Sequence, residues 1–133
     1  GPAKPGPGAG ATLVGARAPL VAFNLELAAP ATVDEAQAIA LRIREGGPEG
    51  LPGVRAIGLE LAGPGVAQVS CNVEDPARTP LAAVVAAVRR HAPVAACELV
   101  GLAPAAAFDG FPADVALPGF DPERHLIERV LGG

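Results

Sequence analysis

Short polar side chains occupy every second position in several apolar stretches of this 133-residue sequence. Such alternation places the polar residues together on one face of a β-strand. Amides, hydroxyls and carboxylates on a rigid sheet can hold a heterocycle or a carboxylate while losing little rotamer freedom. The same pattern is also typical of the solvated side of an ordinary antiparallel sheet, so both interpretations stand. The candidate binding residues are Asn24, Glu26, Gln68, Ser70, Asn72 and Glu98.

Arg17 is a further candidate, because it precedes the first of these stretches and follows Gly15 by two residues. An arginine at the end of a sheet could bind a glutamate carboxylate through two parallel hydrogen bonds. It could equally be an ordinary surface arginine. Asn24 and Asn72 are expected on neighbouring strands, where they would either contact a ligand or hydrogen-bond each other.

Neither histidine has a partner that predicts catalysis. His91 follows a helix whose C-terminal dipole favours a cation, and His125 is expected on the solvated surface. Cys71 and Cys97 alternate with polar residues, which indicates small core hydrophobes, and their spacing fits no zinc motif. We therefore assign no catalytic residue and no metal ligand in this chain.

Three of the four phenylalanines fall in one proline-rich segment towards the C-terminus. Aromatic side chains there could stack on a ring of a ligand, but they more often attach a loop to the core. We predict the second role for Phe108, Phe111 and Phe120.

Four strands and two helices are needed to position these residues. The alternating stretches predict strands over 20–27, 54–61, 66–73 and 94–100. In the second of them, the larger side chains Ile57, Leu59 and Leu61 are expected against the helices, with Ala56 and Gly58 on the open face. Thr32 and Glu35 form a capping box at the start of a helix that ends before Gly46.

A second helix is expected to begin with Thr79 as its N-cap and Pro80 in its first turn. A last helix should run from Asp121 to about Leu131. The order β-α-β-β-α-β predicts an α+β, ferredoxin-like sandwich with both helices on one face of a four-stranded antiparallel sheet. The first and third strands should be central. Residues 1–18 are expected to be a Gly/Pro-rich arm, and residues 19–133 the folded domain with its C-terminal helical segment.

Composition narrows the class of protein. Half of the residues are hydrophobic and 18% are charged, which is too apolar for a disordered chain. A net charge of −4 argues against nucleic acid and anionic membranes as partners. The apolar runs are too short for a spanning helix, and the N-terminal residues do not resemble a secretory leader. We expect a cytoplasmic protein. The absence of methionine suggests a fragment of a longer chain.

Five segments of the sequence match one enzyme family in order and spacing. They are GATLVGARAPLVAFNLEL (10–27), GLPGVRAIGLEL (50–61), VAQVSCNVEDPARTPL (66–81), ACELVGLAP (96–104) and FDPERHLIERVL (120–131). These segments resemble the C-terminal subdomain of glutamate formimidoyltransferase, also called formiminotransferase. The departures are Cys71, where methionine is common in that family, and a shortened, proline-rich stretch over 104–120.

The resemblance implies transfer of the formimidoyl group from N-formimidoylglutamate to N5 of tetrahydrofolate, a co-substrate, in histidine breakdown. It places folate in a tunnel between the facing sheets of two subdomains, with the catalytic histidine in the N-terminal one. No residue of this chain inherits that role. The chain alone is therefore expected to be inactive, and its partner would be the N-terminal subdomain, in cis or as a separate chain.

Two other functions remain open. The chain could be a non-catalytic ferredoxin-like module for ligand binding or dimerisation, because open sheet faces of this fold often pair. It could also be the substrate-binding part of a different one-carbon or amidino transferase. In either case, an open face that is half apolar predicts self-association, and the chain could form a homodimer.

Overall fold

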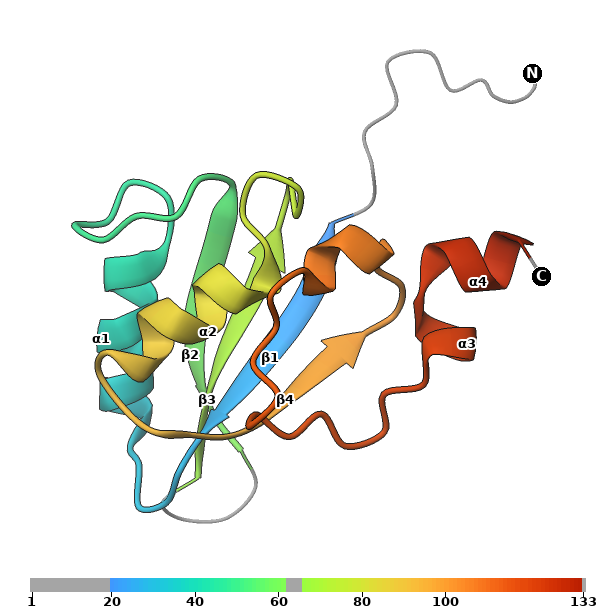
Figure 1. Cartoon of the computed structure of the whole chain (residues 1–133). Coiled ribbons are helices and arrows are strands. Elements are labelled where there is room, and N and C mark those ends of the chain that lie inside the picture. Colours follow the sequence, from blue (N-terminus) through green and yellow to red (C-terminus); the bar gives the residue numbers. More distant parts are fainter. Residues whose placement is uncertain (1–19, 62–65, 133) are drawn as a thin grey trace, which may run out of the picture.

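A computed structural model describes residues 20–61 and 66–132 of the chain. The predicted arm and Arg17 lie outside the described residues. Within them the strands and helices follow one another in the expected order β-α-β-β-α-β. A short 3₁₀ turn and two short helices follow the last strand (Figure 1). The elements are β1 (Val21–Leu27), α1 (Val33–Ile43), β2 (Val54–Glu60), β3 (Ala67–Val73), α2 (Leu81–Arg89), β4 (Val94–Val100), the 3₁₀ turn Ala105–Phe108, α3 (Pro122–His125) and α4 (Ile127–Gly132).

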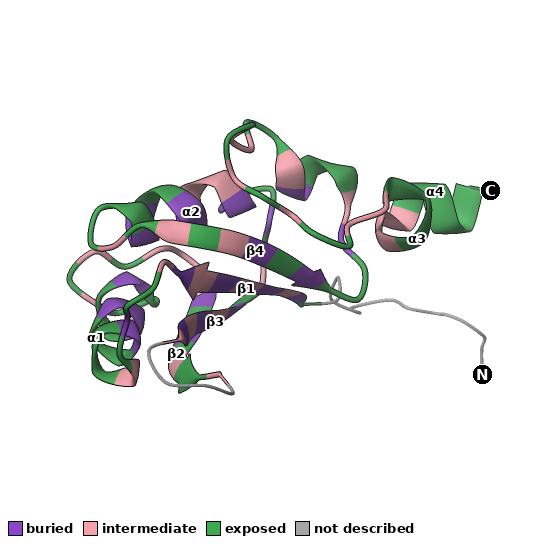
Figure 2. Cartoon of the chain, turned by 90° about the horizontal axis from the view of Figure 1, so that it is seen from below, coloured by how far each residue is buried: buried purple, intermediate pink, exposed green. Residues whose placement is uncertain are grey.

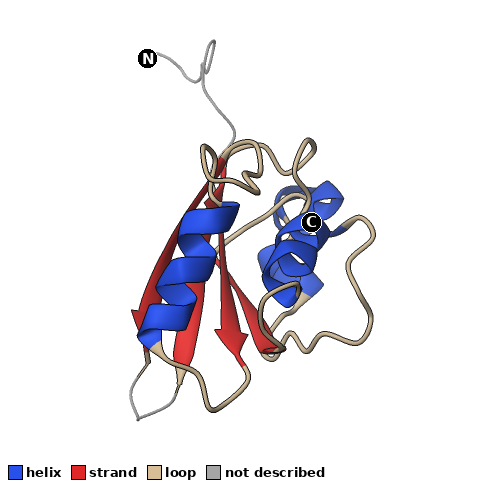
Figure 3. Ribbon diagram, turned by 90° about the vertical axis from the view of Figure 1, so that its left-hand side faces the viewer, coloured by secondary structure: helices blue, strands red, loops and turns tan. Residues whose placement is uncertain are grey.

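The four strands form one antiparallel sheet in the order β2-β3-β1-β4. This confirms the predicted α+β, ferredoxin-like fold with the first and third strands in the centre. Helices α1 and α2 lie against the same face of the sheet (Figures 1 and 3). The opposite face has no helix over it among the described residues, and this is the face on which the polar candidates were expected.

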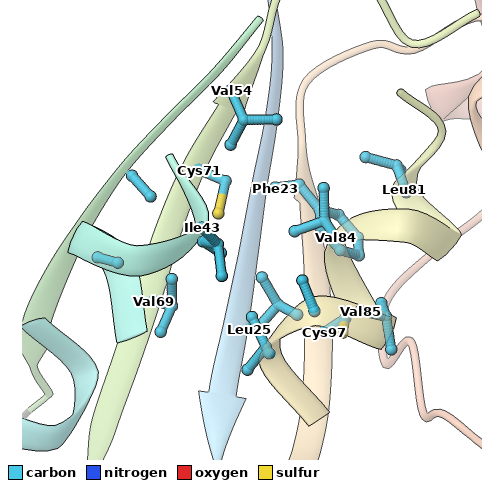
Figure 4. Packing of buried hydrophobic residues seen from close by; sticks show 14 of the residues in the cluster. Phe23, Leu25, Ile43, Val54, Val69, Cys71, Leu81, Val84, Val85 and Cys97 are labelled. Carbon is cyan, nitrogen blue, oxygen red and sulfur yellow. The ribbon is translucent and has the colours of Figure 1, made fainter. Parts of the chain in front are cut away.

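The core lies between the sheet and the two helices (Figure 4). Phe23 and Leu25 of the central strand β1 are fully buried there. Val84 and Val85 of α2 are at most 1% exposed. Burying each such side chain contributes about 1.5–3 kcal/mol. Exposed residues concentrate on the outer sides of the helices and at α4 (Figure 2). No helix in the described part of the chain is both long and apolar enough to cross a membrane.

Helix α1 begins as predicted, with a complete capping box. The Thr32 hydroxyl oxygen accepts a hydrogen bond from the Glu35 amide at 3.1 Å, and the Glu35 carboxylate accepts one from the Thr32 amide at 2.9 Å. Helix α2 begins one residue later than predicted, with Pro80 as its N-cap. The Thr79 hydroxyl does not cap the helix, because it donates to the carbonyl oxygen of Pro52 at 2.7 Å.

The predicted orientation of β2 is wrong. Val54 and Ala56 are buried against the helices, whereas Ile57 is 54% exposed on the open face. Gly58 explains the difference, because a Cβ atom there would lie 2.3 Å from the backbone nitrogen of Gln37 in α1. The helix therefore packs directly on the backbone of β2 at Gly58, and no side chain fits beneath it at that position.

The predicted last helix is broken into two. Asp121 caps α3, and its carboxylate accepts a hydrogen bond from the amide of Glu123 at 3.0 Å. Leu126 then adopts an extended conformation, because the residues on either side of it hydrogen-bond to the buried Ala103. The Ile127 amide donates to the Ala103 carbonyl, and the Ala103 amide donates to the His125 carbonyl, both at 2.9 Å. These bonds tie the C-terminal segment to the chain just after β4.

The phenylalanines of the C-terminal segment attach it to the core, as predicted. Phe111 packs edge-on against Phe23 of β1 with ring centroids 6.0 Å apart. Phe108 then contacts both Phe111 and Phe120, at 5.5 and 4.9 Å. The expectation that His125 is a solvated surface residue is wrong. Its ring is partly buried and stacks on that of Phe120 at 5.6 Å.

Candidate functional site

The strand register arranges the open face as three rows of four side chains. Opposite residues of neighbouring strands share a row, and each row runs from β2 through β3 and β1 to β4. Polar side chains fill most of the two central columns, and larger apolar ones lie mainly at the edges. The rows are Arg55, Asn72, Ala22 and Val100; then Ile57, Ser70, Asn24 and Glu98; then Leu59, Gln68, Glu26 and Ala96.

A depression of about 320 Å³ lies over two of these rows. Its size suits a small molecule or one ring system of a larger one. Four of the six predicted binding residues on strands contribute to its lining, so the structure brings these four side chains together at one place. The lining residues are Asn24, Glu26, Leu61, Gln68, Ala96, Cys97, Glu98 and Pro118.

Asn24 is the centre of a hydrogen-bonded chain that crosses three strands. Its Oδ1 accepts a hydrogen bond from the Ser70 hydroxyl at 2.9 Å. Its Nδ2 donates to Oε1 of Glu98 at 3.3 Å. Because both ends of the amide have partners, the side chain of Asn24 is fixed in one orientation. Ser70 does not line the depression, but it orients a residue that does.

Asn72 does not pair with Asn24 as predicted. It stands opposite Ala22 of β1 and Arg55 of β2, one row away from Asn24. Asn72 therefore lies on the open face but outside the depression. The alternation of β3 alone could not reveal this, because the row in which a residue stands depends on the pairing register.

Several residues of this face were missed by the sequence patterns. Ile57 and Leu59 were assigned to the wrong side of β2, and their exposed side chains, at 54% and 38%, form an apolar border beside the polar columns. Pro118 reaches the depression from the segment after the 3₁₀ turn. The signal for Ile57 and Leu59 was available in Gly58, because a glycine within a strand often marks a close approach of another backbone.

The segment that carries Pro118 runs along the outer edge of β4. The Cys97 amide donates to the Ala116 carbonyl at 2.8 Å, so the segment hydrogen-bonds the edge strand. Arg89 of α2 binds the Asp114 carboxylate with 2.8 Å between the closer nitrogen and oxygen. This pair lowers the pKa of Asp114 through the hydrogen bonds and charge of Arg89. One wall of the depression is therefore held by contacts with β4 and α2.

The cysteine thiols and the histidine rings supply no reactive group to the depression. Cys71 and Cys97 are buried free thiols that form no disulfide, and burial raises the pKa of each thiol to about 12. His91 binds the Glu49 carboxylate at 2.9 Å beyond the end of α2. The described residues contain no group of three or more His, Cys, Asp or Glu side chains placed to hold a metal ion.

Together these observations define an α+β domain of the ferredoxin-like class, with a ligand-sized depression, lined by both polar and apolar residues, on the uncovered face of its sheet. The profile of the formiminotransferase domain matches residues 22–110, which is more than half of the chain. The chain belongs to the formiminotransferase domain family.

Relatives with established names agree with this assignment. The chain is 36% identical over 137 residues to glutamate formimidoyltransferase of Streptococcus pyogenes serotype M1, a match that covers 96% of this chain and 44% of the relative. It is 41% identical over 114 residues to formimidoyltransferase-cyclodeaminase of Rattus norvegicus, a match that covers 78% of this chain and 21% of the relative. The formimidoyltransferase-cyclodeaminase of Gallus gallus is 43% identical over 105 residues, a match that covers 71% of this chain and 19% of the relative. The chain thus spans less than half the length of these relatives.

Proposed function

We propose that this chain is the folate-side half of a glutamate formimidoyltransferase. The reaction would transfer the formimidoyl group of N-formimidoylglutamate to N5 of tetrahydrofolate. Support comes from the formiminotransferase domain match and from the streptococcal relative, whose similarity extends over nearly the whole chain. A role in histidine breakdown and a cytoplasmic location are part of the same proposal.

The observation that carries the proposal is the depression on the open sheet face. A pterin ring has flat apolar faces and edges rich in hydrogen-bond donors and acceptors. The depression offers matching groups, because polar side chains from three strands line it and Ile57 and Leu59 border the same face. The proposed binding residues are Arg17, Asn24, Glu26, Gln68, Ser70, Asn72 and Glu98, with Ser70 acting through Asn24.

We assign the catalytic groups to an N-terminal subdomain. Within residues 20–61 and 66–132, the depression is lined by no histidine, and Cys97, which is among its lining residues, is buried. A general acid or base must come within hydrogen-bond reach of the proton that it transfers. His91 binds Glu49 and His125 hydrogen-bonds the backbone of Asp121, so neither reaches the open face.

The experiment compares the purified chain with the same chain joined to the N-terminal region of a complete formiminotransferase. Formation of 5-formimidoyltetrahydrofolate is followed by its absorbance. We expect no product from the chain alone and product from the joined protein. Turnover by the chain alone would show that its own residues are sufficient, which would end the two-half assignment.

Binding is tested separately with the chain itself and folinate, a stable tetrahydrofolate derivative. We expect folinate to shift the amide resonances of the open-face residues in ¹⁵N NMR spectra. The variant Asn24→Ala should weaken binding about tenfold, because it removes the group that joins Ser70 to Glu98. A folinate titration that shifts no resonance of this face would contradict the proposal.

One observation favours a second function, a dimerisation module. Four large hydrophobic side chains on the open side of the sheet or at its margin are between 38% and 54% exposed, namely Leu20, Ile57, Leu59 and Val100. Exposed apolar patches of this kind often mark interaction sites. Sedimentation equilibrium distinguishes the two functions, because a module for dimerisation would give a stable dimer that Ile57→Arg dissociates. A monomer at all concentrations would remove this alternative.

A further inference from the structure

The depression on the open face presents two carboxylates close together. Glu98 of β4 stands opposite Asn24 of β1, and Glu26 of β1 stands opposite Ala96 of β4. Glu26 and Glu98 are therefore diagonal neighbours on adjacent strands, a relation that separates the backbones by about 7–8 Å and leaves long side chains within reach of one small group. Both residues line the same depression.

No described lysine, arginine or histidine neutralises these two carboxylates. The ion pairs among the described residues involve other acids. Among the described residues of the sheet, Arg55 is a cation on the same face, but it stands two rows from Glu26 and pairs with Glu74 at 3.5 Å. The amide of Asn24 occupies one oxygen of Glu98, which leaves the other carboxylate oxygen available.

Two carboxylates beside a fixed amide make a site that accepts hydrogen bonds rather than donates them. A carboxylate is best satisfied by two parallel N–H donors in one plane, as an arginine guanidinium supplies them. The same N–C–N arrangement occurs in an amidinium and along the amino edge of a 2-amino-4-oxopyrimidine. Negatively charged groups, by contrast, are repelled from this end of the face.

We propose that Glu26 and Glu98 bind a planar N–C–N pair of donors and so set the direction in which the substrate lies on the sheet. The inference rests on the proposed function and specifies the chemistry of its site. In that reaction the donors have two sources, the formamidine group of N-formimidoylglutamate and the N2–N3 edge of the pterin. From either source, the glutamate carboxylates of the ligand point away from Glu26 and Glu98.

The experiment uses the ¹⁵N-labelled chain and three small ligands, titrated separately. Formamidinium chloride represents the formamidine group, pterin represents the amino edge, and folinate represents the whole co-substrate. The variants are Glu98→Gln and the double variant Glu26→Gln with Glu98→Gln. Glu60→Gln is the matched control, because Glu60 is an exposed glutamate at the end of β2 and does not line the depression.

We expect formamidinium or pterin to shift the resonances of the residues that line the depression. Glu98→Gln should weaken that binding about tenfold, because a neutral hydrogen bond replaces a charge-assisted one. The double variant should weaken it further, and Glu60→Gln should bind as the wild type does. The ligand whose binding changes identifies the source of the donor pair.

Equal affinities in the wild type and the double variant would overturn the inference, as would the absence of any shift with both small ligands. The proposed function is tested by folinate in the same titrations. If folinate binds the open face while neither formamidinium nor pterin loses affinity in the variants, the donor-pair inference fails and the folate site remains. If folinate shifts no resonance of the face, both fail.

Discussion

Replacement of Gly58 by alanine tests the packing that distinguishes the two faces of β2. The added Cβ atom would lie 2.3 Å from the nitrogen of Gln37 and 2.6 Å from the carbonyl carbon of Ala36. Both are backbone atoms of α1, so rotation of a side chain cannot relieve the overlap. The helix must move away from the sheet, and that movement also strains the 2.8 Å hydrogen bond from the Gly58 amide to Oε1 of Gln37.

The size of the effect follows from these contacts. Overpacking in a core costs about 1–3 kcal/mol, and loss of the hydrogen bond adds about 1 kcal/mol. The smaller entropy of the unfolded alanine chain offsets these by about 0.4–1 kcal/mol. We therefore expect Gly58→Ala to lower the free energy of unfolding by about 1–3.5 kcal/mol, with a central value of about 2 kcal/mol, and Tm by roughly 10 °C.

The assay is urea denaturation followed by far-ultraviolet circular dichroism, because the chain has no Trp or Tyr for fluorescence. Gly132→Ala is the matched control, since no atom lies within 4 Å of the added Cβ there. Ile57→Ala should cost about 1 kcal/mol or less, because the side chain is half exposed. If Gly58→Ala is neutral and Ile57→Ala costs several kcal/mol, then Ile57 rather than Gly58 faces α1, and the orientation of β2 is the reverse of the one described.

Three further outcomes are expected. Thr32→Ala should lower the free energy of unfolding by about 1 kcal/mol in urea denaturation, because it removes the cap of α1; an unchanged midpoint would contradict this role. Cys71 and Cys97, whose pKa values are raised to about 12 by burial, should resist iodoacetamide at pH 8 until urea unfolds the chain, as mass spectrometry would report. The pKa of Glu49 is held below its ordinary value by the hydrogen bond from Arg42 and then by that from His91. This carboxylate therefore stabilises the fold above about pH 4.3, and its contribution is lost as pH falls further through the lowered pKa. Glu49→Gln should show a shallower loss of stability over that range, and identical pH profiles would contradict the assignment.

Most of the fold followed from local patterns in the sequence. The alternation in β1 and β3 identified their inner and outer faces correctly, because larger hydrophobic residues, among them Phe23, Leu25 and Val69, all fall on one side. The capping box at Thr32 placed the start of α1 to the residue. The order of elements then left few ways to connect four strands with two helices on one face.

The wrongly predicted orientation of β2 shows what alternation along a strand cannot predict. Both faces of that strand carry apolar residues, and hydrophobic size pointed Ile57 and Leu59 inwards. The structure reverses this because α1 lies so close to β2 that no side chain fits at Gly58, and Val54 and Ala56 are buried on the same side of the strand. The distance between a helix and a sheet is a property of the packed domain, and alternation along one strand does not encode it.

The C-terminal segment gives a second example. The pattern from Asp121 to Leu131 is helical throughout, and α3 and α4 do form on either side of a break. The break at Leu126 comes from hydrogen bonds that His125 and Ile127 make with Ala103, more than twenty residues earlier in the chain. Local propensity could not predict a partner so distant.

By itself, the sequence determined the fold class, the residue types that β1, β3 and β4 place on the open face, and the resemblance to formiminotransferases, because alternation and capping act over a few residues. Only the tertiary structure decided which polar residues lie side by side. The register placed Asn24 beside Ser70 and Glu98 and moved Asn72 to another row. A shift of pairing changes every neighbour across the strands while leaving each strand's own pattern intact, so the depression exists only once the strands are aligned.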